Sequence, residues 1–249
     1  MWVMLDSNTL ILTAGIILLA STVKGLTGFG FALTSLPLLS IFLEPQIAVP
    51  MITICSVFLD GYTLYEARQD VRYREIVPLV VSGIVGMTFG TYVLVSLDSR
   101  IIKLVIGVVT VLFTIASIKG LRWEIKNTSQ ASIPVGLLSG LLGGSISISG
   151  PPIVLFFNNQ NVEKKTFRAN LIAYFFCLYV ATVPAYFYGD LITWGLIRSS
   201  LYLVPALFMG ASIGIWLSHK VDETLFKRIA LLLILVTGLM AILTAIGLV

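Results

Sequence analysis

The stretches KGLTGFGFALTSLP (Lys24 to Pro37) and SGLLGGSISISGPP (Ser139 to Pro152) each interrupt a long apolar run with closely spaced Gly, Ser or Thr. Residues of these types weaken a helix or let the backbone approach another group closely. Inside a bilayer, broken backbone is tolerated only where it is buried in protein or lines a cavity. Two breaks at corresponding places in two halves of a chain are typical of the binding site of a secondary transporter. We therefore expect the rest of the chain to be arranged around this pair.

The composition predicts a polytopic membrane protein. Of the 249 residues, 57% are hydrophobic and only 11% are charged, whereas soluble domains carry about 25% charged residues. The net charge of +4 fits basic cytoplasmic loops better than nucleic-acid binding. Cys55 and Cys177 both lie in apolar runs, which indicates small buried residues and not a disulfide framework. The residues before the first apolar run include no basic residue, so we expect no cleavable signal peptide.

Polar stretches divide the chain into two halves. We expect an N-terminal transmembrane repeat at residues 1–120, a polar cytoplasmic linker at 121–131 and a C-terminal transmembrane repeat at 132–249. Each half begins with an interrupted run and continues with three uninterrupted elements, which we expect at 47–66, 76–97, 101–120, 166–187, 191–218 and 224–248. The first break leaves arms of about 15 and 13 residues, each shorter than the roughly 20 residues that span a bilayer. The predicted fold class is an all-α integral membrane protein.

The two halves also resemble each other residue by residue. GMTFGTYVLVSLDSRIIK, beginning at Gly86, aligns without a gap with GASIGIWLSHKVDETLFK, beginning at Gly210, at an offset of 124. At the breaks, an offset of 115 aligns Gly25, Gly28 and Pro37 with Gly140, Gly143 and Pro152. Any two apolar helices can look alike, but charged ends that match in register favour a duplication. The paired glycines would let helices pack closely in lipid.

Basic residues distinguish two topologies, because Lys and Arg favour the cytoplasmic side. If both interrupted runs cross the membrane, the two sides carry 7 and 8 basic residues. If each run is a re-entrant helical hairpin, the counts become 12 and 3, and Lys24 stays inside the membrane. The second arrangement obeys the rule. It predicts six full spans, two hairpins, both termini outside, and halves in opposite orientation as an inverted repeat.

The second break has the residue types of an anion site. Proline favours the first position of a helix, so we expect a half-helix to begin at Pro151 or Pro152. Serine hydroxyls together with the free amides and positive dipole end of a helix bind anions. The candidate substrate-binding residues here are Ser145, Ser147, Ser149, Gly150, Pro151 and Pro152.

The first break could present a second half-helix start, facing the first one, just before Phe31. Lys24 adds a full positive charge at membrane depth, and an ionisable residue there indicates a functional role. The alternative is that its side chain extends to the membrane–water interface. The candidate substrate-binding residues here are Lys24, Gly25, Thr27, Gly28, Phe29 and Gly30. Two positive helix ends that converge near the middle of the membrane would attract a small anion.

Three further polar residues are candidates. Arg168 either binds substrate or is only a positive-inside charge, and Asn170 is polar enough to line the site. Asp60 is the acidic candidate for proton coupling, since intramembrane carboxylates serve as relays; the alternative is an interface carboxylate near the end of its span. Four tyrosines are predicted to be packing or interfacial residues, namely Tyr174, Tyr179, Tyr186 and Tyr188.

At the two breaks the sequence resembles the TauE/SafE family, the sulfite-exporter-like transmembrane transporters. KGLTGFGFALTSLP and GLLSGLLGGSISISGPPIVLFF carry the resemblance, and the order of elements extends it over essentially the whole chain. The resemblance implies transport of a small anion: sulfite, a sulfonate such as sulfoacetate, or a related organic acid. The family often has Gly-Gly ahead of its Gly-Pro-Pro, where this chain has Ser147, Ile148 and Ser149. This departure bears on the substrate more than on the fold.

We therefore predict a secondary transporter that exports a small anion by alternating access, located in the inner membrane of a prokaryotic cell. The alternatives are an anion channel and a carrier for small organic carboxylates. A membrane enzyme is disfavoured, because the only histidine, His219, lies in a charged loop and no cluster suits a metal. We expect no catalytic residue, metal or cofactor. The expected partners are the anion and the lipid bilayer, not nucleic acid. The sequence does not decide whether the protein forms an oligomer.

Overall fold

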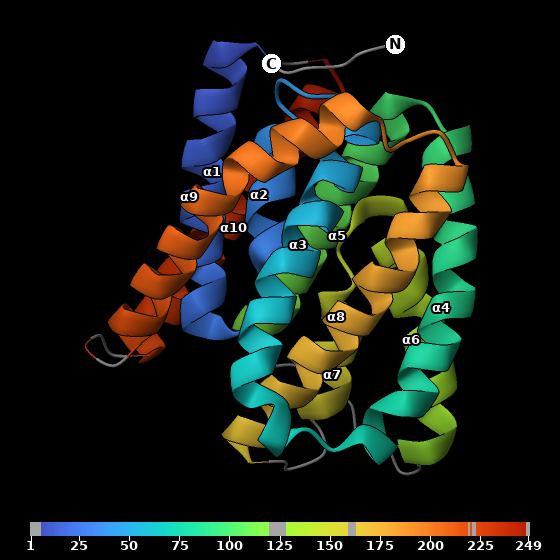
Figure 1. The fold of residues 1–249 in the computed structure, drawn as a ribbon, viewed down its shortest axis with the longest axis vertical. Helices are drawn as coiled ribbons and strands as arrows, with labels where there is room; N and C mark the ends of the chain where they lie inside the picture. Colours follow the sequence, from blue (N-terminus) through green and yellow to red (C-terminus); the bar gives the residue numbers. More distant parts are fainter. Residues whose placement is uncertain (1–5, 120–127, 159–162, 219, 221–222, 248–249) are drawn as a thin grey trace.

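A computed structural model describes residues 6–119, 128–158, 163–218, 220 and 223–247, and these residues form helices without any strand (Figure 1). Six helical segments, including α1 but not the described part of α10, are long and apolar enough to cross a membrane. The prediction of an all-α integral membrane protein is therefore confirmed. The elements are α1 (Ser7–Thr27), α2 (Phe31–Leu39), α3 (Pro45–Ala67), η1 (Arg68–Asp70), α4 (Tyr73–Ser96), α5 (Ser99–Ile118), α6 (Thr128–Ile146), α7 (Gly150–Asn158), α8 (Lys164–Tyr188), α9 (Trp194–Ser218) and α10 (Glu223–Ala245).

Both interrupted runs fold as a long helix followed by a short one. The predicted arm lengths for the first run are wrong, because α1 has 21 residues and α2 has 9. Gly25 does not break α1; the helix continues to Thr27, and only residues 28–30 leave it. In the second run, α7 begins at Gly150, one residue before the predicted proline start. Pro151 and Pro152 therefore lie in its first turn, where proline leaves no amide unpaired.

The two hairpins enter from opposite ends of the molecule. In Figure 1, α1 begins at the end where α10 finishes, and α2 runs back towards that end. The long helix α6 begins at the other end, and α7 returns there. Residues 121–127 of the predicted linker lie outside the described residues, as does His219, whereas residues 128–131 already belong to α6.

Glycines set which helices pack most closely. A Cβ on Gly86 or Gly90 of α4 would stand 2.1 or 2.3 Å from carbonyl oxygens of α6. A Cβ on Gly210 or Gly214 of α9 would likewise stand 2.3 or 2.2 Å from carbonyl oxygens of α1. Backbones this close require glycine on the facing helix. Each hairpin's long arm therefore packs against a span from the other half of the chain.

Apolar side chains face both inward and outward. The interior holds large, fully buried residues such as Tyr174, Tyr186 and Phe157. Many other large apolar side chains are exposed on the outer faces of the helices, for example Ile11, Phe89 and Leu112. An exposed apolar surface of this extent suits lipid and would be costly in water.

Candidate functional site

Residues with left-handed backbone form both breaks. Gly28 (φ 83°) caps the C-terminus of α1 and donates its amide to the Lys24 carbonyl over 2.7 Å. Gly30 (φ 95°) is the N-cap residue of α2 and offers no side chain to the first amides of that helix. In the second break, Ser147 has φ 53°, which a residue with a Cβ rarely adopts. Glycine is unstrained at such angles, so the first break is relaxed and the second is held in place by other contacts.

The two breaks meet at one small cavity. Residues 29–33 and 147–150 line it, together with Lys24, Ser56, Phe175 and Tyr179. The first turn of α2 and the N-terminal residue of α7 therefore border the same space. The cavity volume is about 20 Å³, room for about one water molecule. In this structure the cavity is therefore closed to any ligand larger than a water molecule.

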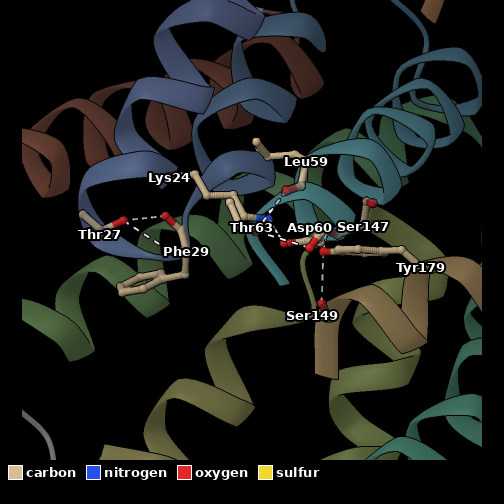
Figure 2. A network of polar contacts seen from close by, with 9 residues as sticks. All are labelled: Lys24, Thr27, Phe29, Leu59, Asp60, Thr63, Ser147, Ser149 and Tyr179. Carbon is tan, nitrogen blue, oxygen red and sulfur yellow. Dashed lines mark hydrogen bonds and ion pairs between the residues drawn. The ribbon is translucent and has the colours of Figure 1, made fainter. Parts of the chain in front are cut away.

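Lys24 and Asp60 form an ion pair at this cavity (Figure 2). The Lys24 ammonium donates to Asp60 Oδ1, and the two residues are 5% and 0% exposed. Lys24 lines the cavity, whereas Asp60 lies behind it on α3 and does not line the cavity. Among the described residues, Asp60 Oδ2 has no hydrogen-bond partner. Both side chains are therefore enclosed by the protein and paired with each other, and neither reaches an exposed surface.

Hydroxyl groups hold the second break to its neighbours. The Ser147 hydroxyl lies 2.8 Å from that of Thr53 on α3. Tyr179 donates to the Ser147 carbonyl over 3.0 Å, and its hydroxyl lies 3.1 Å from the Ser149 hydroxyl. These contacts fix the strained backbone at Ser147 and place three hydroxyls near the cavity. Lys24 approaches from the other side, with its ammonium 5.8 Å from the centre of the Phe175 ring.

The structure corrects the interpretation of one of the four tyrosines. Tyr179 is not an interfacial residue but lines the cavity. Tyr174 and Tyr186 are fully buried and donate hydrogen bonds to Ser139 and to the Gly144 carbonyl. Tyr174 and Tyr186 are therefore packing residues, and Tyr188, which is 87% exposed, lies at the surface, as predicted.

Several predicted residues lie beside the cavity without lining it. Gly25 contacts α9, and a Cβ there would stand 2.5 Å from the Ala211 carbonyl oxygen. The Thr27 hydroxyl is used in the turn, where it contacts the carbonyls of Val23 and Phe29. Ser145 donates within α6 to Leu141 over 2.7 Å. Gly28, Pro151 and Pro152 shape the backbone at the helix ends.

Arg168 and Asn170 join α8 to neighbouring helices through hydrogen bonds that the sequence did not predict. Arg168 donates to the Gly25 carbonyl over 2.9 Å, and its side chain covers Gly28. Asn170 is fully buried, accepts from the Arg72 amide over 2.8 Å and donates to Glu75 over 3.0 Å. Arg168 therefore ties α8 to the end of α1, and Asn170 ties α8 to the start of α4. Neither residue lines the closed cavity.

Sequence reasoning missed Thr53, Ser56 and Phe175. Each is a single small or aromatic residue inside an apolar run, a pattern that ordinary packing also produces. Among the described residues, no group of three or more His, Cys, Asp or Glu side chains is placed to hold a metal ion.

Comparison with known proteins supports the resemblance noted from the two breaks. No curated protein and no solved structure matches this chain significantly. The family model described as "Sulfite exporter TauE/SafE" matches residues 13–241, which include all of the cavity-lining residues. The chain therefore belongs to the TauE/SafE family of membrane transporters.

Proposed function

We propose that this protein is a secondary transporter that exports sulfite or an organosulfonate such as sulfoacetate. The observation that carries the proposal is the convergence of two helix starts, at α2 and α7, on a cavity that Lys24 also lines. Both helix N-termini bring a positive dipole end to such a site, and α2 also brings unpaired amides, whereas Pro151 and Pro152 of α7 have none to offer. An anion is the ligand that suits this combination.

The groups at the cavity suit an oxyanion in particular. The amides of residues 31–33 begin α2 and receive no side-chain cap from Gly30. The hydroxyls of Ser147, Ser149 and Tyr179 stand across from them. The α2 amides and the Lys24 ammonium are the donors that would bind the oxygens of a sulfonate or sulfite group. In this structure the hydroxyl protons of Tyr179, Ser149 and Ser147 are donated within the protein, so these hydroxyls would change partners when an anion binds. The apolar surroundings strengthen each of these interactions, because they exclude water.

The hairpins also suit alternating access. The long arm of each hairpin packs against a span of the other half, α1 on α9 and α6 on α4. We infer an inverted repeat from this exchange and from the opposite directions of α1 and α6 in Figure 1. Rocking one packed pair against the other would open the closed cavity first to one side and then to the other. The proposed orientation has both termini outside the inner membrane of a prokaryotic cell.

Ligand binding by the purified protein tests the site. Thermal melting is measured with sulfite, sulfate, thiosulfate, sulfoacetate, malonate and a neutral sugar, because a ligand bound only by the native state raises apparent stability with concentration. We expect a sulfur anion to raise the melting temperature and Ser149→Ala to remove most of the increase. Ser40→Ala is the matched control, because the Ser40 hydroxyl is buried but bonds within its own segment to Leu36. A shift with the sugar and with no anion would overturn the proposal.

Transport in proteoliposomes separates the alternatives. A carrier should show flux of the stabilising anion that saturates with concentration, whereas a channel should show flux that rises nearly linearly. Stabilisation and transport of malonate, without any response to sulfur anions, would instead identify a carrier for small organic carboxylates.

A further inference from the structure

The ion pair of the first half has an uncharged counterpart in the second half. The offset of 115 that aligns the two breaks aligns Lys24 with Ser139. Lys24 on the long arm α1 contacts Asp60 on α3, the first span after its hairpin. Ser139 on the long arm α6 contacts Tyr174 on α8, again the first span after its hairpin, over 2.9 Å. The same two elements are thus joined by charges in one half and by neutral hydroxyls in the other.

The neutral pair shows that the fold can make this connection without charge. Ser139 and Tyr174 are both fully buried, and the Ser139 hydroxyl donates a hydrogen bond to the Ser149 carbonyl over 2.6 Å. A buried ion pair is seldom needed for stability, because removing two charges from water offsets their attraction. Ionisable residues at membrane depth are instead associated with function. Lys24 and Asp60 therefore call for a role that Ser139 and Tyr174 cannot perform.

The position of Lys24 indicates that role. Lys24 lines the cavity, and its ammonium contacts Asp60, which does not line the cavity. An anion in the cavity would attract the same ammonium that now binds Asp60 Oδ1. Asp60 Oδ2 has no partner among the described residues, so this oxygen is open to a proton.

We propose that the transported anion and the Asp60 carboxylate compete for Lys24, and that Asp60 takes up one proton when the anion binds. This inference rests on the proposed function. Lys24 keeps its charge throughout and exchanges one carboxylate partner for the substrate. The proton comes from water and goes to the carboxylate, which becomes a neutral carboxylic acid. Before the exchange the charges of Lys24 and Asp60 cancel. After it, the anion offsets the charge of Lys24 and Asp60 is neutral, so one proton would move with each anion; a dianion such as sulfoacetate leaves one net negative charge at the site.

Few other titratable groups face Asp60. Its charge interacts with Lys24 on α1 and with the phenol of Tyr179 on α8. The neighbouring helix α2 carries no titratable residue, and neither does the part of α6 whose side chains are described. On the other packed elements, the ionisable groups with described side chains lie near the helix starts or ends. They are Glu66, Arg68, Asp70, Arg74, Glu75, Arg100, Lys103, Lys165, Arg168 and Arg198. The remaining buried phenols and thiols on α3 and α8 carry no charge at neutral pH.

The test measures binding of sulfoacetate to the purified full-length protein between about pH 6 and 8. Both acidic groups of this probe stay ionised there, since carboxylic acids titrate near pH 4, so any pH dependence belongs to the protein. We expect the affinity of the wild type to rise as pH falls, by up to about tenfold per pH unit for one linked proton. Calorimetry in two buffers with different ionisation enthalpies should show uptake of about one proton.

Variants assign the proton to Asp60. Asp60→Asn should bind at every pH about as tightly as the wild type does at low pH, and without proton uptake. Lys24→Gln should lose binding. The double variant Lys24→Gln/Asp60→Asn imitates the neutral pair of the second half; it should melt like the wild type without ligand and still fail to bind. That result shows that Lys24→Gln acts through charge and not through unfolding.

Two results would overturn the exchange. Wild-type protein that binds sulfoacetate with the same affinity from pH 6 to 8 and without proton uptake excludes it, whatever the variants do. If Asp60→Asn melts normally but its affinity for sulfoacetate keeps the wild-type pH dependence, another group takes up the proton. In both cases the anion site itself stands. If neither sulfoacetate nor any other anion of the panel binds the wild type, the proposed function fails and the exchange fails with it.

Discussion

Ser147 holds a left-handed backbone although it carries a Cβ, with φ 53°. Such a conformation costs about 1–3 kcal/mol, and the hydrogen bond from its hydroxyl to Thr53 contributes about 1 kcal/mol. Ser147→Ala keeps the strain and loses the bond, so we expect a loss of about 1–2 kcal/mol. Ser147→Gly loses the bond but relieves the strain, so its stability should stay close to that of the wild type. Thermal melting in detergent, with Ser40→Ala as control, should rank Gly above Ala. The reverse order would contradict the backbone angle at this position.

A second prediction concerns the stability of the Lys24–Asp60 pair in the absence of ligand. Lys24→Met leaves a fully buried carboxylate without a partner, which should cost about 3–5 kcal/mol at neutral pH. The loss should shrink as pH falls, because protonation removes the unpaired charge. Adding Asp60→Asn should restore most of the stability. Melting curves of the three proteins at two pH values check this; a double variant as unstable as Lys24→Met would show that packing of the lysine stem, not charge, is what matters.

Residue types at the breaks could be predicted from the sequence, but their partners could not. Glycine and serine density located the breaks within Lys24 to Pro37 and Ser139 to Pro152, although not their exact bounds. Lys24 and Asp60 are 36 positions apart, and Ser147 and Tyr179 are 32 apart. Only the packing of α1, α3 and α8 brings these side chains together, and no local pattern encodes it. Tyr179 was misassigned for this reason: a tyrosine in an apolar helix looks the same at a lipid interface and at a cavity.

At the scale of the helix, glycines on α6 control its contact with α4. A Cβ on Gly140 would stand 1.9 Å from the Gly83 carbonyl oxygen, and neither backbone can yield without separating the helices. Gly140→Ala should therefore reduce the yield of folded, monodisperse protein severely. Gly15→Ala on α1 is the matched control, since nothing lies within 4 Å of a Cβ there; it should be neutral or slightly stabilising, because alanine favours helix. Size-exclusion chromatography and melting of both variants test the contact, and equal behaviour of the two would refute it.

The extent of each helix could be predicted where polar residues end it, but not at the first break. The expected element at 76–97 and the observed α4, Tyr73–Ser96, differ by three residues at most. The first break was placed too early, since Gly25 looked like part of it. Glycine serves two purposes in this motif: Gly28 and Gly30 supply positive φ, whereas Gly25 stays helical and provides room for α9. Glycine appears in the sequence in both cases, and only the position of the neighbouring helix shows whether a glycine provides positive φ or close packing.

At the scale of the whole molecule, the exchange of partners between halves explains why both breaks reach one cavity. Because α1 packs on α9 and α6 on α4, neither half can close its own hairpin without the other. The aligned glycines at 86, 90, 210 and 214 pointed to close packing, but not to the partner helices. A chain cut within residues 121–127 should therefore yield two fragments that are stable only when expressed together. Co-purification of differently tagged halves measures this, and a half that purifies alone as a folded monomer would contradict it.

The direction of the hairpins makes a prediction about which loops share a side of the membrane. Figure 1 places the junction of α3 and α4 at the end opposite the start of α1. With re-entrant hairpins, Asp70 and Lys220 lie on the cytoplasmic side, and Ser7 and Arg100 lie outside. If both interrupted runs crossed the membrane instead, Asp70 and Lys220 would lie on opposite sides.

Single cysteines at these four positions decide between the two topologies. All four residues are exposed in the structure, and the native Cys55 and Cys177 are first replaced by Ala. A maleimide that does not cross membranes should label Ser7→Cys and Arg100→Cys in intact cells. It should label Asp70→Cys and Lys220→Cys only after permeabilisation. The excess of basic residues on the cytoplasmic side favours this result. Labelling of Asp70→Cys and Lys220→Cys from opposite sides would show that the interrupted runs are full spans, and the two halves would then have the same orientation.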